Sequence, residues 1–188
     1  LSHLCGIATA TRKFVDMVKP YKTKILDTRK TIPGLRQLQK YAVRIGGGCN
    51  HRMGLWDGIL IKDNHIAASC PRRDASCVRR LIEIAKAKRP KNLKIEIEVI
   101  NLNEFKEALK AAPDIIMLDN MKIDTIKKAA LIRRRMKGVR RRTLIEVSGG
   151  VSLDNVREIA KTGVDIISIG GLTHSARAID MSLEVIEK

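Results

Sequence analysis

Residues 94–100 read KIEIEVI, and this stretch decides between the folds that the rest of the chain allows. Apolar and acidic side chains alternate along it as on a β-strand, so Glu96 and Glu98 share one face and the apolar residues share the other. A strand packed between two layers of helices would bury both carboxylates among apolar side chains, at a high cost in desolvation. We therefore expect both glutamates to face an interior that is polar near one end.

Further apolar segments of strand length alternate with segments of helical period along the chain. The predicted strands cover residues 24–27, 58–62, 93–100, 114–119, 143–147 and 164–169. The helix predicted after the first strand carries Leu35, Leu38, Ala42 and Ile45 on one face, and it stops at the glycines 46–48. This alternation predicts a parallel α/β sheet, either doubly wound or closed as a (β/α) barrel.

Polar and glycine residues gather at the carboxyl ends of these strands. Asp27 and Arg29 follow the first strand, Lys62 and Asp63 end the second, Asp119 ends the fourth, Ser148-Gly149-Gly150 follows the fifth, and Gly170-Gly171 follows the sixth. The carboxyl ends of barrel strands form the catalytic face in enzymes of this architecture. Together with the inward glutamates, this pattern favours a (β/α) barrel with a catalytic mouth.

The composition limits the classes of protein to consider. The 188 residues carry 37 Lys and Arg against 20 Asp and Glu, a formal net charge of +17, and 44% of them are hydrophobic. These values exclude general disorder, and no apolar run approaches the roughly 20 residues that span a bilayer. Since no signal-peptide pattern is present, we expect a soluble, cytoplasmic protein whose partners are anionic.

The four cysteines, Cys5, Cys49, Cys70 and Cys77, form no C-x-x-C pair. Metal clusters use tighter pairs, and disulfide scaffolds belong mainly to small secreted chains. We therefore expect reduced thiols with structural roles.

Basic side chains at strand ends suit an acidic ligand. Arg29-Lys30, His51-Arg52 and Lys62 each lie at or beside a strand end. Because a guanidinium fork matches a carboxylate, several such groups around one cavity suit a substrate with more than one carboxylate. Arg36 and Arg44 lie on a predicted helix instead, where a solvated face is the better interpretation.

Two glycine pairs occupy consecutive β–α loops, in Ser148-Gly149-Gly150 and in Gly170-Gly171. Bare backbone N–H groups in such loops hold phosphate, and the last loops of a barrel are a frequent phosphate site. This spacing favours phosphate binding over a purely structural role for the glycines.

Two carboxylates, Glu98 and Asp119, end neighbouring strands and could meet above the barrel. Carboxylate oxygens together with substrate phosphates are the usual ligands of Mg²⁺. The alternative is that they are salt-bridge partners of Lys62 and Arg29, and both interpretations can hold at once.

Long motifs spread along the whole chain resemble one enzyme family. They are ILDTRKTIPGLR at 25–36, KYAV at 40–43, GGGCNHR at 46–52, LIKDNH at 60–65, EIEV at 96–99, MLDN at 117–120, EVSGG at 146–150 and LTHS at 172–175. In this order they are similar to the motifs of quinolinate phosphoribosyltransferase, also named carboxylating nicotinate-nucleotide pyrophosphorylase. The resemblance covers essentially the whole chain.

The resemblance implies a reaction and a fold. The family transfers a phosphoribosyl group from phosphoribosyl pyrophosphate to quinolinate with Mg²⁺. It releases pyrophosphate and carbon dioxide and forms nicotinate mononucleotide for NAD biosynthesis. The family's barrel is an incomplete, TIM-like barrel of seven strands, so the resemblance adds a further strand to those predicted above.

The resemblance also implies roles for individual residues. The quinolinate carboxylates and neighbouring phosphates would be bound by Arg29, Lys30, His51, Arg52 and Lys62. The ribose hydroxyls and Mg²⁺, the latter directly or through water, would be held by Glu98 and Asp119, which with Lys62 make up the catalytic set. The 5-phosphate would be cradled by Ser148, Gly149, Gly150, Gly170 and Gly171, with His174 nearby.

Family members carry an additional N-terminal domain, which contributes an arginine to the active site of the neighbouring subunit in a dimer. Residues 1–20 resemble the linker helix into the barrel, so we expect residues 1–188 to form one barrel domain, with the N-terminal domain absent from this chain. The expected assembly is a homodimer or a higher homo-oligomer, in which the N-terminal domain of a neighbour would complete the site.

Two alternatives remain open. Residues 122–142 include ten Lys or Arg and one acid, a basic patch that would attract nucleic acid. Only five aromatic residues occur in the chain, too few for a base-stacking platform, so a solvated basic helix is the better interpretation. The second alternative is a paralogue on the same barrel that acts on another pyridine carboxylate, because the shape of the cavity selects the acceptor.

Overall fold

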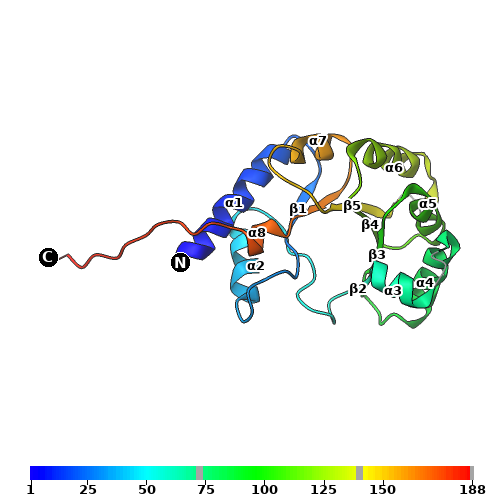
Figure 1. Ribbon diagram of the computed structural model, residues 1–188, viewed down its shortest axis with the longest axis horizontal. Helices are drawn as coiled ribbons and strands as arrows, with labels where there is room; N and C mark the ends of the chain where they lie inside the picture. The colour runs from blue at the N-terminus through cyan, green and yellow to red at the C-terminus, as the bar shows by residue number, and fades with distance from the viewer. Residues whose placement is uncertain (71–73, 139–141, 187–188) are drawn as a thin grey trace.

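The computed structural model describes residues 1–70, 74–138 and 142–186, and a curved parallel sheet forms its centre (Figure 1). In spatial order the six strands are β1 (Lys24–Leu26), β6 (Ile166–Ser168), β5 (Leu144–Ser148), β4 (Ile115–Asp119), β3 (Ile95–Val99) and β2 (Ile59–Ile61). Each one lies within a predicted strand except β5, which extends one residue past the predicted end at 147. All neighbouring strands are parallel, as the alternation with helices predicts.

Helices follow the strands and lie on the outside of the curved sheet (Figure 1). They are α1 (Ser2–Val18), α2 (Arg36–Ile45), α3 (Asp63–Ser69), α4 (Ala75–Lys88), α5 (Leu102–Ala111), α6 (Ile123–Arg135), α7 (Val156–Lys161) and α8 (Gly171–His174). The helix expected near residues 1–20 is confirmed as α1, which packs on α2, α7 and β1 and buries Ile7 and Val18. Among the described residues, no helix is both long and apolar enough to cross a lipid bilayer.

The expected seventh strand is not formed within the described residues, and the sheet is not closed. Among those residues β1 and β2 are the two edges of the sheet. A single parallel bridge joins Leu26 to Cys49, so the chain passes beside β1 at the place that a further strand would fill. The ladder ends there because the next amide, that of His51, donates to the Asp27 side chain at 2.8 Å.

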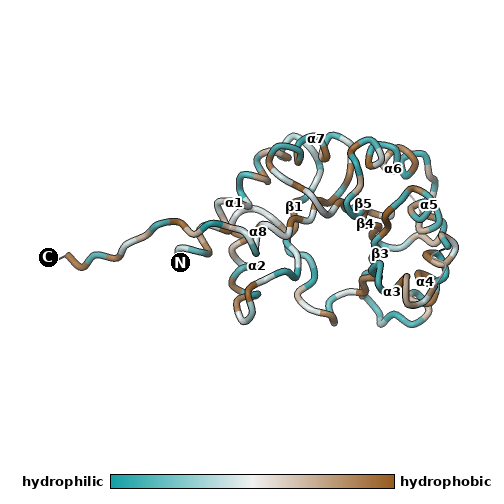
Figure 2. The backbone as a smooth tube through the Cα atoms, in the orientation of Figure 1, coloured by the Kyte–Doolittle hydropathy of each residue, from teal (hydrophilic) through white to brown (hydrophobic). Residues whose placement is uncertain are grey.

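The two faces of the sheet have different surroundings. Its outer face packs with the fully buried Ile97 and Ile116 against the helices, of which α5 contributes the fully buried Phe105. The sequence of β4 is mostly apolar (Figure 2). Its inner face carries Glu96 and Glu98, which are only 3% and 6% exposed. The glutamates therefore point into the barrel, as the alternating sequence predicts.

The apolar face identified on α2 is not the face that the helix buries. Leu35, Leu38 and Ile45 are exposed, at 38%, 50% and 59%, and of the predicted set only Ala42 is buried. The helix instead turns polar residues inward, with Gln39 and Lys40 almost completely buried. The physical reason is Asp27, whose buried carboxylate attracts the Lys40 ammonium and rotates the helix about its axis.

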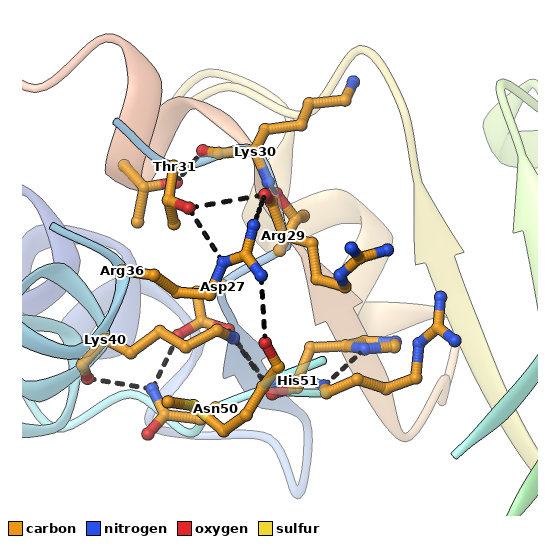
Figure 3. A network of polar contacts seen from close by, with 12 residues as sticks. Asp27, Arg29, Lys30, Thr31, Arg36, Lys40, Asn50 and His51 are labelled. Atoms are coloured by element: carbon orange, nitrogen blue, oxygen red, sulfur yellow. Dashed lines mark hydrogen bonds and ion pairs between the residues drawn. The ribbon is translucent and has the colours of Figure 1, made fainter. Parts of the chain in front are cut away.

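A polar network around Asp27 ties β1 to α2 and to the segment before β2 (Figure 3). Asp27 is 0% exposed and Lys40 is 1% exposed, and the two form an ion pair. The Asp27 carboxylate also accepts hydrogen bonds from the Asn50 side chain and from the His51 amide. Burial raises the pKa of Asp27 and lowers the pKa of Lys40, and the ion pair opposes both shifts. Each charge is therefore tolerated only because of the other.

The cysteines depart from the expectation of reduced thiols. Cys70 and Cys77 are joined as a disulfide between the end of α3 and the first turn of α4, whereas Cys5 and Cys49 are free. The sequence separation of seven residues does not reveal this pairing, because α4 brings the second sulfur back toward the first.

The buried ion pair makes a prediction about stability. Lys40→Met should lower the free energy of unfolding by about 3–5 kcal/mol, because Asp27 would keep its buried charge without a partner. The control is Lys127→Met, which removes an exposed pair with Asp124 and should cost at most about 1 kcal/mol. Urea denaturation of both variants measures the difference, and equal losses would show that the Asp27 network does not stabilise the fold.

Candidate active site

A cavity of about 840 Å³ opens at the carboxyl ends of the strands. Every predicted site residue lines this mouth: Arg29, Lys30, His51, Arg52, Lys62, Glu98, Asp119, Ser148, Gly149, Gly150, Gly170, Gly171 and His174. The loops after β1, β2, β4, β5 and β6 all contribute to it, because parallel strands bring their carboxyl ends to the same edge. The structure thus gathers the whole predicted set in one place.

Hydrogen bonds that involve backbone groups hold the two arginines of the mouth in place. The Arg52 guanidinium donates to the Gly58 carbonyl at 3.0 Å, and the Arg52 amide donates to Nδ1 of His51 at 2.7 Å. Arg29 is held indirectly, since its carbonyl accepts a hydrogen bond from Arg36 at 3.3 Å (Figure 3). These contacts fix the direction of the cations and leave charge available toward the cavity.

Arg36 was expected to be solvated, and this prediction was wrong. Its guanidinium is partly buried and also donates to Thr31 Oγ1 at 3.0 Å and to the Met53 carbonyl at 3.2 Å. It therefore joins the loop after β1 to the segment before β2. Arg44 is exposed as predicted and stacks over the Tyr41 ring at 5.7 Å.

The acidic residues form a second group in the mouth. Glu98 Oε2 lies 3.2 Å from Nζ of Lys62, so the salt-bridge interpretation is confirmed for this pair. Burial raises the pKa of Glu98, Lys62 opposes the shift, and the charges of Asp119 and Asp63 add to it. Glu98 thus lies within electrostatic reach of two further carboxylates, and Glu98, Asp119 and Asp63 all line the open cavity. Hard oxygen donors in this arrangement fit the preferences of Mg²⁺.

The glycine loops have conformations that side chains would disturb. Gly149 has φ +88° and Gly150 has φ +61°, in the left-handed region that favours glycine. A Cβ atom on Gly149 would also collide with the Asn120 side chain from the loop after β4. The backbone at this position can therefore approach a ligand closely, as phosphate-binding loops do.

Two buried glutamates, Glu96 and Glu146, lie beneath the mouth, and neither was predicted as a site residue. His51 Nε2 lies 3.0 Å from Glu96 Oε2 and 3.6 Å from Glu146 Oε1. Burial raises the pKa of Glu146 to about 8, Glu96 adds to the shift, and His51 opposes it. Glu96 shares a strand face with Glu98, and Glu146 shares one with Ser148. This two-residue spacing is the sequence signal that could have found both.

Unsatisfied polar atoms gather at this same place. In the part of the chain that the structure describes, the buried side-chain nitrogen and oxygen atoms without a well-aligned hydrogen bond belong to Arg29, His51, Arg52, Glu96, Glu146 and Ser168. His51 Nε2 is among them despite its short distance to Glu96, because the geometry is that of an ion pair rather than an aligned hydrogen bond. Buried polar groups are usually paired, so this concentration marks a site prepared for a ligand or a function.

The basic segment at residues 122–142 lies away from the mouth. Arg133 of α6 pairs with Asp165 at 2.6 Å and donates to the Gly163 carbonyl at 3.2 Å, and Lys127 pairs with Asp124 at 3.5 Å. Of the other predicted patch residues, Arg140 and Arg141 lie outside the described residues. Arg133 therefore stabilises the contact between α6 and the loop before β6.

Comparison with known proteins agrees with this geometry. The family described as "Quinolinate phosphoribosyl transferase, C-terminal domain" matches residues 7–184. The chain is 47% identical to the "Probable nicotinate-nucleotide pyrophosphorylase [carboxylating]" of Methanocaldococcus jannaschii, over 99% of this chain and 64% of the relative. It is also 47% identical to the "Nicotinate-nucleotide pyrophosphorylase [carboxylating]" of Mycobacterium leprae, over 97% of this chain and 61% of the relative.

Solved structures give the same result for the fold. The nicotinate-nucleotide pyrophosphorylase of Ehrlichia chaffeensis superposes with a TM-score of 0.83 at 47% identity, over 96% of this chain and 61% of that one. NadC from Streptococcus pyogenes superposes with a TM-score of 0.86 at 40% identity, over 98% and 61%. The chain thus spans about three fifths of the length of these relatives. It belongs to the quinolinate phosphoribosyltransferase family and corresponds to the C-terminal domain of that family.

Proposed function

We propose that this chain provides the barrel of an enzyme that transfers a phosphoribosyl group from phosphoribosyl pyrophosphate to quinolinate. The products would be nicotinate mononucleotide, pyrophosphate and carbon dioxide. The observation that carries the proposal is the single cavity in which cations suited to a dicarboxylate adjoin carboxylates and glycine loops suited to a phosphorylated sugar. Family membership supports the same reaction.

The acceptor would bind at the basic side of the mouth. Quinolinate carries two neighbouring carboxylates, and the guanidinium groups of Arg29 and Arg52 can each pair with a carboxylate. His51 lines the same wall, and Lys30 and Lys62 provide further positive charge. Both arginines have a buried Nε without an aligned partner, which leaves this part of the wall ready to accept an anion.

The donor would bind across the cavity. The loops at Ser148-Gly149-Gly150 and Gly170-Gly171 would hold the 5-phosphate by their backbone, with His174 beside the second loop. Glu98 and Asp119 would contact the ribose hydroxyls, whose O–H groups would donate hydrogen bonds to the carboxylates. Glu98 and Asp119 would also hold Mg²⁺, which when bound supplies positive charge for the departing diphosphate.

The residues of this chain would act mainly by positioning and by electrostatics. Departure of the diphosphate leaves an oxocarbenium-like ribose, and the pyridine nitrogen attacks its anomeric carbon. The pyridinium that forms stabilises the electron pair left on the ring when the adjacent carboxylate departs as carbon dioxide, and that carbon then takes a proton from water. No protein nucleophile is required. Cations around the carboxylate and exclusion of water are the needed contributions.

We also propose a homodimer or higher homo-oligomer, as the resemblance implies, and a cytoplasmic location. The exposed stripe of α2, formed by Leu38, Tyr41 and Ile45, supports self-association because a contiguous apolar face is unfavourable in water. A neighbour seated there would lie next to the loop after β1 and so near the mouth. The cytoplasmic location is supported by the donor, since phosphorylated sugars do not cross membranes unaided.

The reaction itself is the first test. The purified protein is incubated with phosphoribosyl pyrophosphate, Mg²⁺ and either quinolinate or nicotinate, and mononucleotide and carbon dioxide are measured. Quinolinate should give both products in equal amounts, and nicotinate should give neither. Turnover of another pyridine carboxylate in place of quinolinate would favour a paralogue with a different acceptor.

Arg52→Lys tests the acceptor site. Lysine keeps the charge but loses the planar fork, so quinolinate affinity measured by calorimetry should fall about tenfold or more. Arg44→Lys is the matched control, since Arg44 is exposed outside the mouth, and it should bind as the wild type does. Equal affinities for all three proteins would remove Arg52 from the site.

Gly149→Ala tests the donor site. The methyl group meets Asn120 and the backbone has φ +88°, so the loop must shift and affinity for phosphoribosyl pyrophosphate should fall at least about tenfold. Gly163→Ala has almost the same φ, +86°, with open space around its Cβ and no place in the mouth, which makes it a control for backbone strain alone. A similar loss in both variants would show that the Gly149 loop has no special role in binding.

Leu38→Lys tests the apolar stripe. A charge in the centre of the stripe should reduce the mass measured by light scattering to that of a monomer, because burial of an unpaired ammonium is costly. Leu131→Lys places the same charge on α6, where the leucine is 38% exposed, and should leave the assembly intact. An unchanged assembly in Leu38→Lys would exclude the α2 stripe as the interface.

A further inference from the structure

The cluster of His51, Glu96 and Glu146 has a geometry that the proposed reaction does not explain. Glu146 is 0% exposed and does not line the mouth, so no substrate atom can contact it without rearrangement. Yet it lies 3.6 Å from His51, which does line the mouth. The proposed acceptor site is therefore supported from below by a buried carboxyl group.

The surroundings of Glu146 are poor in charge-stabilising groups. Glu96 faces it from β3, and Ser168 faces it from β6. His51 faces it from the segment before β2, and the charge of Arg52 acts on His51. From β4 comes Met117, which does not titrate and lies beside Glu146 in the sheet register. Toward the amino ends of the strands Leu26, Ile115 and Ile166 pack together, and a second cavity of about 620 Å³ reaches Glu96 and His51 but not Glu146, which is 0% exposed. Water is therefore a weak source of stabilisation for a charge on Glu146.

Three ligand atoms from a histidine and two carboxylates resemble a metal site, but the hydrogen bonding of His51 argues against one. These atoms lie within 4.8 Å of one another. However, Nδ1 of His51 accepts a hydrogen bond from the Arg52 amide at 2.7 Å, so Nδ1 carries no proton. The neutral ring must then carry its proton on Nε2, the atom that faces the carboxylates. A metal-bound histidine shows the opposite pattern, in which the other ring nitrogen donates.

A proton is therefore the better explanation for how this cluster balances its charge. Nε2–H of His51 is one donor shared by two carboxyl groups, and its shorter distance is to Glu96. Both oxygens of Glu146 lack an aligned hydrogen bond, which is costly for a buried carboxylate and much less so for a neutral acid. Burial and the charge of Glu96 raise the pKa of Glu146 to about 8 although His51 and the Ser168 hydroxyl oppose the shift, which agrees with this geometry.

We propose that Glu146 is a positioning residue that lies beneath the mouth as a neutral carboxylic acid, and that loss of its proton weakens binding of the acidic acceptor. A second buried negative charge would draw the Nε2–H of His51 downward and would repel a dicarboxylate bound above it. This inference rests on the proposed function for the identity of the acceptor. The protonated state of Glu146 does not depend on it.

The first experiment measures quinolinate affinity by calorimetry at pH 7 and pH 9. Quinolinate keeps the same charge over this range. If only the protonated enzyme binds and the proton is lost near pH 8, the competent fraction falls from about nine tenths to about one tenth, so wild-type affinity should fall about tenfold. Glu146→Gln is neutral at both values and should lose little affinity. Glu107→Gln, on the surface of α5, is the matched control and should behave as the wild type does.

The second experiment needs no ligand and is made on the wild type. Infrared spectra should contain the C=O stretch of a protonated carboxylic acid at pH 7, which disappears above pH 9 and is absent from Glu146→Gln. An absent band at pH 7 in the wild type would overturn the inference, even if the variant failed to fold. An equal loss of affinity in wild type and Glu146→Gln, or no loss in the wild type, would also overturn it.

The two experiments separate this inference from the proposed function. If quinolinate fails to bind the wild type at pH 7 while the infrared band is present, the proposed acceptor is wrong. In that case Glu146 is still a neutral acid, but its link to acceptor binding is overturned. If quinolinate binds and the band is absent, the acceptor stands and the inference fails.

Discussion

The ion pair between Asp27 and Lys40 is the interaction on which the mouth of this barrel depends. The described part of the sheet is open between β1 and β2, and the ladder that joins β1 to the segment before β2 ends at Cys49, before His51 and Arg52. Asp27 holds this segment instead, by accepting from the Asn50 side chain and the His51 amide while its charge is balanced by Lys40 (Figure 3). The carboxylate does not line the cavity, yet it places two side chains that do.

Above and below this segment the barrel interior is layered by charge. The mouth presents Arg29, Arg52 and Lys62, and the layer beneath them contains the buried Glu96 and Glu146. Both carboxyl groups lie against His51, and the cations above are left available for an anionic ligand. Such an interior costs stability, which agrees with the unsatisfied polar atoms found there.

Much of this arrangement could be predicted from the sequence, because it depends on local pattern. The six strands follow from apolar runs, the inward glutamates from alternation, and the members of the mouth from polar residues at strand ends together with the family motifs. The place of Gly149 in the mouth was likewise predicted from the loop that follows its strand.

The failures share a cause, which is that a contact distant in sequence decided the outcome. The buried face of α2 could not be found from its apolar residues, because it depends on the ion pair of Lys40 with Asp27. Arg36 and the Cys70–Cys77 disulfide were missed for the same reason, since each depends on a neighbour that only the fold provides. Glu146 lies in a strand whose sequence is mainly apolar, and its proposed role follows only from its contacts with His51 and Glu96 in the fold.

The central claim is that a residue outside the cavity builds the acceptor site, and quinolinate binding to Asp27→Asn tests it most directly. The titration is made well below the unfolding temperature of the variant, with circular dichroism confirming that it is folded. The account predicts that affinity falls at least about tenfold, since His51 and Arg52 lose their anchor while every cavity-lining side chain is retained. Wild-type affinity in the folded variant would contradict the account.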